Sequence, residues 1–218
     1  SSQSSAEDDA LPENRQLATP HFPRYALRPM YLLFQLVQVI YWLALATWFG
    51  GVLFVAISAP VIFRTVRDAR PRLPAVLSAN LDEQHGSLLA GSIVGAILNA
   101  LVKVELACAA ALLVTQVGQW TLADTATSDQ WFAAIVRSAL FVAATGIVVH
   151  DWLILWPRIV MLRHQYIDHA DEPDLANPAR EQFDACHRLS VTLMSVKLFL
   201  LLGMILFSGG IAYGRVIL

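Results

Sequence analysis

Four long stretches of the chain are almost continuously apolar, at about residues 31–61, 87–117, 131–156 and 189–213. Each is at least as long as the roughly 20 residues that a helix needs to cross the hydrocarbon core of a bilayer. The apolar residues run on without the alternation that the strands of a membrane barrel require, so these stretches predict helices. A helix also satisfies its own backbone hydrogen bonds in lipid. The pattern therefore predicts an all-α protein, an integral membrane four-helix bundle.

The polar segments between these stretches set the expected boundaries. Residues 1–29 are rich in serine and acidic residues, which predicts a disordered tail ahead of a transmembrane domain at 30–218. The first apolar run is too long for a signal-peptide core, so we interpret it as a retained span. Because proline kinks or ends a helix, Pro60 is expected to mark the inner end of the first span and Pro157 the end of the third. After a loop at 168–177, Asn177 and Pro178 predict the start of the last helix.

Arginine residues near the span ends predict the orientation in the membrane. The loop after the first span and the segment between the third and fourth spans carry eight arginines, and the other span ends carry four. Since basic residues concentrate on the cytoplasmic side, both arginine-bearing segments are expected inside and both termini outside.

The composition narrows the functional classes. Charged residues make up 15% of the chain, against about 25% in a soluble domain. The net charge of −2 gives no polycationic signal for nucleic acid. Cys108 and Cys186 are expected toward opposite faces of the membrane, which argues against a disulfide and for buried small hydrophobic side chains. We predict a lipid bilayer as the main partner and no nucleic acid.

Charged residues inside the spans are the main candidates for function. Lys103 and Glu105 are the only charged residues between Gly86 and Val117. A charge at mid-bilayer costs about 2.5–3.5 kcal/mol, so it is expected to face protein or water. Matching depths at ~1.5 Å per residue predict that Glu105 pairs with Arg137, and that Asp151 pairs with Lys197 or Lys103. The alternative is that these groups line a path for an ion, a proton or a substrate. The predicted polar interior comprises Asn99, Lys103, Glu105, Arg137, His150, Asp151 and Lys197.

The second span is expected to be covered on two sides. Lys103 and Glu105 are about 200° apart around a helix that turns roughly 100° per residue, so they cannot both face one neighbour. The span therefore lies centrally in the bundle, or it contacts a second copy or another subunit of a membrane complex through residues 87–117. Gly91, Gly95, Asn99 and Lys103 follow at steps of four, and the two glycines form a GxxxG that permits close helix approach.

Histidines offer further candidate sites. His150 is either a hydrogen-bonded packing residue or a ligand of haem or a metal. His187 stands at the entry to the last span with Ser190 on roughly the same side, where it could bind headgroups, cap a helix or line a cavity. The loop around His164 to Asp174 is either a solvated acidic loop or a metal site. No P-loop, GxSxG, HExxH, CxxC or GxGxxG motif occurs. We therefore predict no catalytic residue and no cofactor, with haem as the alternative, and leave the metal content open.

Two stretches resemble a known family. "LALATWFGGVLFVAISAPVIFR" (43–64) resembles the first span of a bacterial family of unknown function related to the transmembrane protein 205 group, and "FDACHRLSVTLMSVKLFLLLGMIL" (183–206) resembles its closing motif. His187 and Ser190 match that motif, whereas Met194 stands where the family pattern has an Asn. The resemblance implies a four-helix protein of the bacterial inner membrane whose relatives are linked to tolerance of toxic compounds.

A fainter similarity is to haem-dependent protoporphyrinogen oxidases and copper-resistance membrane proteins. Trp48 to Leu53 and His150 fit that pattern, but Tyr41 stands near the place of the expected first-span histidine. Three hypotheses follow. The protein serves small-molecule or ion transport or membrane-stress tolerance; it is an accessory subunit of a larger membrane complex; or it is a haem-binding oxidoreductase centred on His150.

Overall fold

The computed structural model describes residues 27–69, 85–122 and 128–209, and these residues are almost entirely helical. Within them there is no strand, which confirms the all-α prediction. The predicted disordered tail lies almost wholly outside the described residues, as does the end of the predicted fourth span beyond residue 209. The helices are α1 (Leu27–Asp68), α2 (His85–Leu122), α3 (Ser128–His150), the π-helical turn η2 (Asp151–Leu155), α4 (Trp156–Asp168) and α5 (Pro173–Ser208).

The described helices have the length and surface of membrane spans. Since α3, η2 and α4 follow one another without a break, the described residues form four helical rods, and each is long and apolar enough to cross a bilayer. Only 17–28% of the most apolar window of each rod is buried inside the protein. Large apolar side chains such as Phe54, Val114 and Phe199 are more than 60% exposed. Such an apolar exterior needs lipid around it, so the protein is an integral membrane protein.

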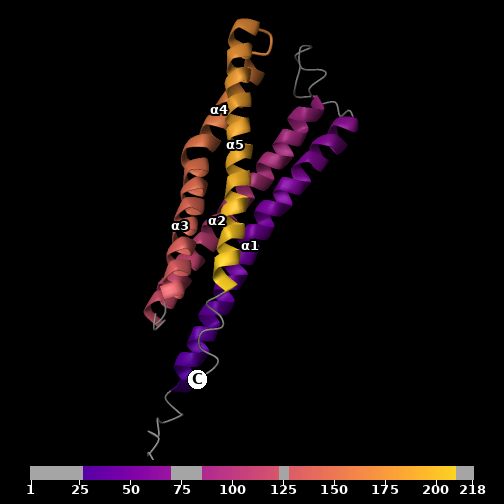
Figure 1. Ribbon diagram of the computed structural model, residues 1–218. Helices are drawn as coiled ribbons and strands as arrows, with labels where there is room; N and C mark the ends of the chain where they lie inside the picture. Colours follow the sequence, from indigo (N-terminus) through magenta and orange to yellow (C-terminus); the bar gives the residue numbers. More distant parts are fainter. Residues whose placement is uncertain (1–26, 70–84, 123–127, 210–218) are drawn as a thin grey trace, which may run out of the picture.

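The four rods are arranged as two antiparallel hairpins (Figure 1). The first consists of α1 and α2, which pack along much of their length, and the second consists of α3, η2 and α4 packed against α5. The hairpins meet through contacts of α1 with α5 and of α2 with α3. They diverge toward the end where α1 finishes, α2 begins and α4 turns into α5 (Figure 1). The closed end holds the core, and the diverging end holds a cavity.

The core fills the closed end of the bundle. Trp48, Leu45 and Val52 of α1 are fully buried, and they form one cluster with Leu112 of α2 and Leu201 of α5. Buried apolar residues of this kind recur every three or four positions on each helix, which is the spacing of one helical face. Cys108 lies in this cluster and is buried as predicted, whereas Cys186 is only partly buried; both are free thiols.

Two prolines do not end helices where the sequence predicts. Pro60 lies inside α1, which continues to Asp68. Pro157 occupies the first turn of α4, directly after η2. Proline cannot donate a backbone hydrogen bond and would clash with the preceding turn of a regular helix. In η2 the amide of Trp156 donates instead to the carbonyl of Asp151, five residues back. This wider turn admits Pro157, so the rod continues.

The start of the last helix is also earlier than predicted. α5 begins at Pro173, and Pro178 lies inside its second turn. Proline is favourable at the first position of a helix because its missing donor has no partner there anyway. Pro173 meets this condition, and the turn before it is held by the amide of Glu172, which donates to the carbonyl of His169 at 2.8 Å. The predicted loop at 168–177 is therefore reduced to a short turn.

Candidate functional site

Glu105 and Lys197 form a buried ion pair between α2 and α5. Lys197 Nζ lies 2.6 Å from Glu105 Oε1, and the two side chains are 4% and 1% exposed. Trp48 Nε1 of α1 donates a hydrogen bond to the same carboxylate oxygen at 3.2 Å. The ion pair and the Trp48 hydrogen bond together connect α1, α2 and α5. A buried charge pair of this kind is held by its geometry and its additional hydrogen bonds.

This geometry contradicts both predicted pairings. Glu105 pairs with Lys197 and not with Arg137, and Asp151 has no lysine within ion-pair distance among the described residues. Equal depth was the basis of the prediction, but depth does not determine which helices are neighbours. α3 packs mainly on α5, and α2 packs mainly on α1. Side chains of α2 and α3 at the same depth therefore face different partners.

Arg137 is buried against an aromatic ring. Its guanidinium carbon lies 5.1 Å from the centre of the Tyr41 ring, and the residue is 2% exposed. The Tyr41 hydroxyl in turn lies 2.6 Å from Ser208 Oγ of α5. Arg137 Nε has no hydrogen-bond partner in the part of the chain that the structure describes. A cation over a ring is favourable in a desolvated site, so Tyr41 takes the role that the sequence analysis assigned to a carboxylate.

His150 and Asp151 lie together where α3 gives way to η2. His150 Nδ1 is 3.8 Å from Asp151 Oδ1, and neither atom has a hydrogen-bond partner among the described residues. The two side chains are 41% and 18% exposed. Within residues 27–69, 85–122 and 128–209, no three His, Cys, Asp or Glu side chains are placed to hold a metal ion, and this includes the acidic turn before α5.

Asn99 and Lys103 depart from the predicted polar interior. Both are exposed on the outer face of α2. No hydrogen bond or ion pair of the Lys103 side chain is found within the described residues. The expectation that neighbouring helices of this chain cover Lys103 is therefore wrong. Of the two charged side chains of α2, Glu105 therefore lies in the core and Lys103 lies on the surface.

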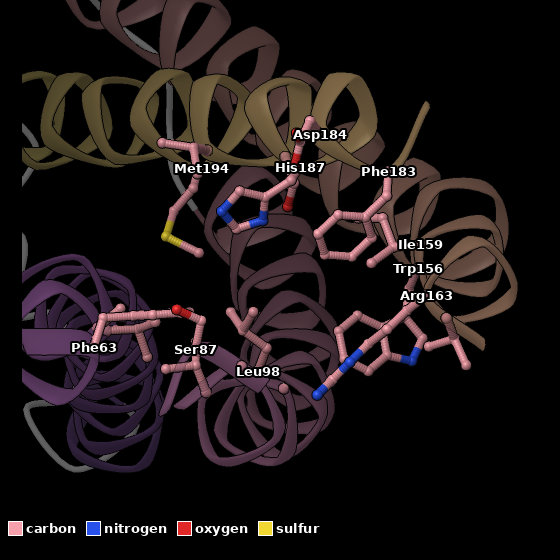
Figure 2. Close-up of a pocket in the computed structure, with 18 of the residues that line it drawn as sticks. Phe63, Ser87, Leu98, Trp156, Ile159, Arg163, Phe183, Asp184, His187 and Met194 are labelled. Atoms are coloured by element: carbon pink, nitrogen blue, oxygen red, sulfur yellow. The ribbon is translucent and has the colours of Figure 1, made fainter. Parts of the chain in front are cut away.

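A cavity of about 700 Å³ opens between the diverging ends of the hairpins (Figure 2). Four helices line it: α1, α2, α4 and α5. Most of its wall is apolar, with Val55 and Phe63 from α1, Leu98 from α2, and Met194 and Leu198 from α5. Ligand sites in proteins commonly have this size and this kind of apolar lining with a few polar groups. The cavity is the candidate functional site of the described chain.

Glycines of α2 shape one wall of the cavity. The α2 and α4 backbones stay apart, and long side chains of α4 fill the space between them. A Cβ atom at Gly95 would lie 3.3 Å from a ring carbon of Trp156, and one at Gly91 would lie 3.8 Å from Arg163 Nη2. The predicted GxxxG thus does not bring two helices into close contact. It receives Trp156 and Arg163, which complete the cavity wall.

The strongly polar groups gather on the α4 and α5 side of the cavity. Arg163 Nη2 donates to the Leu88 carbonyl at 2.7 Å and to Ser92 Oγ at 2.8 Å, so its guanidinium is fixed against α2. On α5, the rings of Phe183 and His187 are stacked with centroids 6.0 Å apart, and Tyr166 of α4 lies 6.1 Å from Phe183. The polar lining residues on these two helices are Arg163, Tyr166, Arg180, Asp184, His187, Ser190 and Ser195.

Two candidates from the sequence analysis lie in the cavity wall, and several residues there were missed. His187 and Ser190 line the cavity, whereas Lys197 points into the ion pair. Arg163, Arg180 and Asp184 were not singled out. A signal for them exists, because Arg180, Asp184, His187, Val191, Met194 and Leu198 recur at steps of three or four along α5. Tyr41 and Trp48 were missed as polar partners because they are aromatic.

The comparisons with known proteins give a family and no activity. Neither a curated protein nor a solved structure matches the chain. A family model described as a domain of unknown function, DUF4149, matches residues 43–167, from within α1 to the end of α4. The first stretch that carries the family resemblance lies in this range, and the second, at 183–206, lies beyond it. The relation to the transmembrane protein 205 group stays a prediction. Since the matched range is more than half of the chain, the protein belongs to the DUF4149 family.

Proposed function

We propose that the protein binds small amphiphilic molecules in the cavity between its hairpins and serves their transport across, or removal from, a membrane. The observation that carries the proposal is the lining of the cavity: an apolar wall from α1 and α2 faces a polar stripe on α4 and α5. An amphiphile presents the same two chemistries. We propose that the protein resides in the bacterial inner membrane, as the family resemblance implies.

The location of the cavity supports this function. In a bilayer, an apolar hollow of about 700 Å³ is filled by hydrocarbon, because leaving it empty forfeits contacts and filling it with water is unfavourable. The hollow is lined by α1 and α2 from one hairpin and by α4 and α5 from the other, at the end where the hairpins diverge (Figure 1). A site of this kind can hold an apolar compound taken from the membrane.

An ion path is less well supported. Glu105 and Lys197 are both nearly inaccessible, and neither lines the cavity. Each is neutralised by the other, and Trp48 occupies the same carboxylate oxygen. A conducting path needs polar groups that water or an ion can reach. The buried pair is therefore assigned a structural role in this proposal.

Trp156 offers a direct test of amphiphile binding. It is one of six tryptophans, and it lines the cavity. The purified protein in a maltoside detergent is titrated with ω-bromododecanol, whose bromine quenches nearby indole fluorescence. We expect saturable quenching that is lost in Trp156→Phe. The exposed Trp131 and Trp152 are expected to give only a linear background of quenching by probe in the micelle. Quenching without a saturable component, or a saturable component that survives in Trp156→Phe, would contradict the proposal.

A matched pair of cavity and surface variants provides the control. Ala59 of α1 lines the cavity, whereas Ala143 of α3 is exposed and lies outside it. Ala59→Phe should fill part of the hollow and weaken the quenching of Trp156. Ala143→Phe adds the same side chain to a lipid-facing position and should leave it unchanged. Equal effects of the two variants would mean that the probe does not occupy the cavity.

Lys103 favours a second candidate function, that of a subunit in a membrane complex. It lies at the centre of α2, is exposed, and has no partner among the described residues. Because an exposed ammonium within a span is costly, we propose that a helix with a carboxylate at matching depth covers it, from a second copy or another protein. Lys103→Leu should lower the mass of the solubilised assembly by light scattering, and Val104→Leu should not. If both variants keep the mass of the parent protein, Lys103 faces lipid.

A further inference from the structure

The charged side chains that line the cavity indicate which charge the head group of a ligand would carry. Arg163 of α4 and Arg180 of α5 line the cavity, and Asp184 is the only acidic lining residue within the described chain. The α1 and α2 walls contribute no charged side chain to this lining. The polar side therefore carries more positive than negative charge.

The Arg163 guanidinium is fixed in position and still has free hydrogen-bond donors. Both hydrogen bonds that fix it to α2 come from Nη2, which leaves the donors on Nη1 and Nε. No carboxylate of the described residues lies within ion-pair distance of its guanidinium. A fixed guanidinium with free donors matches the oxygens of a phosphate or a carboxylate. Because the side chain is already positioned, binding does not have to order it.

Arg180 lines the same cavity as Arg163 and Tyr166. Asp184 also lines it, and the ring of Tyr166 lies 6.1 Å from that of Phe183 on α5, so these polar side chains share the α4 and α5 side of the cavity. Tyr166 can donate a hydrogen bond to the same oxygens. Arg163, Asp184 and His187 border a common space in Figure 2, with Leu98, Phe63 and Met194 on its other sides. A head group at the α4 and α5 side therefore places its chain along the apolar wall.

From this arrangement we propose that the cavity selects amphiphiles with an anionic head group, a phosphate or a carboxylate, bound by Arg163 and Arg180 with the chain directed toward Leu98. The proposal rests on the proposed function and names the class of its ligand. The same head-group chemistry could belong to a free amphiphile or to a phospholipid of the surrounding bilayer.

The test compares three probes that share one bromoalkyl chain. Binding of ω-bromododecyl phosphate, ω-bromododecanol and ω-bromododecyltrimethylammonium is measured by quenching of Trp156 in maltoside. We expect the phosphate to bind most tightly and the trimethylammonium most weakly, with a difference that shrinks as salt is added. Equal affinities for the three probes would overturn the charge selectivity and leave amphiphile binding intact. No saturable binding of any probe would overturn both.

A pair of arginine variants locates the effect. Arg180 lines the cavity, whereas Arg188 is exposed on the same helix outside it. Arg180→Gln should weaken phosphate binding by roughly tenfold or more, as loss of a charge-assisted hydrogen bond does, and leave bromododecanol binding unchanged. Arg188→Gln should change neither. Equal phosphate affinities of the two variants would overturn the assignment of the head-group site.

A last arm separates the two sources of the anion. The protein is placed in lipid nanodiscs that contain brominated phosphatidylglycerol or brominated phosphatidylcholine. Stronger quenching of Trp156 by phosphatidylglycerol, reduced in Arg180→Gln, supports a phospholipid occupant. Equal quenching by both lipids, together with tight binding of the dodecyl phosphate, assigns the site to a free anionic amphiphile. Equal quenching without selective phosphate binding contradicts the proposal.

Discussion

Lys197 Nζ lies 2.6 Å from Glu105 Oε1, and this contact joins two helices that share hardly any backbone contact. α2 belongs to one hairpin and α5 to the other, so the pair ties the hairpins together just inside the point where they diverge. Trp48 adds a donor from α1 to the same oxygen. One carboxylate thus joins α1, α2 and α5, which belong to the two hairpins.

The two lysines of the chain should respond oppositely to removal of their charge. Lys197→Met leaves Glu105 buried without its cation, and breaking a buried pair in this way costs about 3–5 kcal/mol. Lys103→Met removes a charge that is exposed in the single chain and has no partner among the described residues, so the free energy of unfolding of the monomer should stay the same or rise. Reversible unfolding in mixed micelles measures both.

A double variant checks the reason for this difference. Glu105→Leu combined with Lys197→Met replaces the pair by apolar side chains of similar size, which is often neutral or stabilising. We expect the double variant to recover much of the stability lost in Lys197→Met. If it is as unstable as the single variant, the contact does more than neutralise charge.

Arg137 should be less important for stability than its burial suggests. No carboxylate pairs with it in the described helices, and its Nε has no hydrogen-bond partner there. Its favourable contact with Tyr41 is worth about 2 kcal/mol in a desolvated site, and burying the guanidinium costs several kcal/mol. Arg137→Met should therefore leave the free energy of unfolding unchanged or raise it. A loss as large as that of Lys197→Met would show an unrecognised anionic partner.

The sequence predicts the membrane class and the four crossings well, because both depend on the length of apolar runs. It predicts helix boundaries at proline poorly. Pro60 lies inside α1, which continues past it. Pro157 lies within the third rod, because the wider turn of η2 admits it. Local sequence shows that a proline disturbs a helix, but the packing around it decides whether the helix ends.

The candidate site was harder to predict than the fold. Depth along a span can be counted from the sequence, but the neighbour that a charge faces depends on which helices pair. Glu105 was correctly expected to need a partner, yet its partner is Lys197 because the hairpins meet there. The cavity lies between two diverging hairpins, and the sequence of a single helix does not show how the hairpins are placed relative to each other. The stripe of polar residues on α5 gave the only local hint.

A small residue at Gly95 is expected to keep the cavity open. A Cβ atom there would lie 3.3 Å from the Trp156 ring, whereas nothing lies within 4 Å of a Cβ atom built at Gly146. Gly95→Leu should push Trp156 into the cavity and weaken its quenching by ω-bromododecanol. Gly146→Leu makes the same substitution on α3 and should leave quenching unchanged. Unaltered binding in Gly95→Leu would mean that Trp156 does not border the occupied space.

Arg163 should be sensitive even to a substitution that keeps its charge. Its guanidinium holds α2 through Nη2 and still presents donors on Nη1 and Nε. The single ammonium of lysine cannot reproduce this fork. Arg163→Lys should therefore lower the affinity for ω-bromododecyl phosphate by about tenfold, with little effect on ω-bromododecanol.

The matched control for this variant is Arg158→Lys, because Arg158 is exposed on the same helix and does not line the cavity. It should bind both probes as the parent protein does. If Arg163→Lys also binds the phosphate like the parent protein, only the charge of Arg163 matters and its fork plays no part. If Arg163→Lys loses both probes equally, Arg163 acts by holding α4 against α2 and not by contacting the head group.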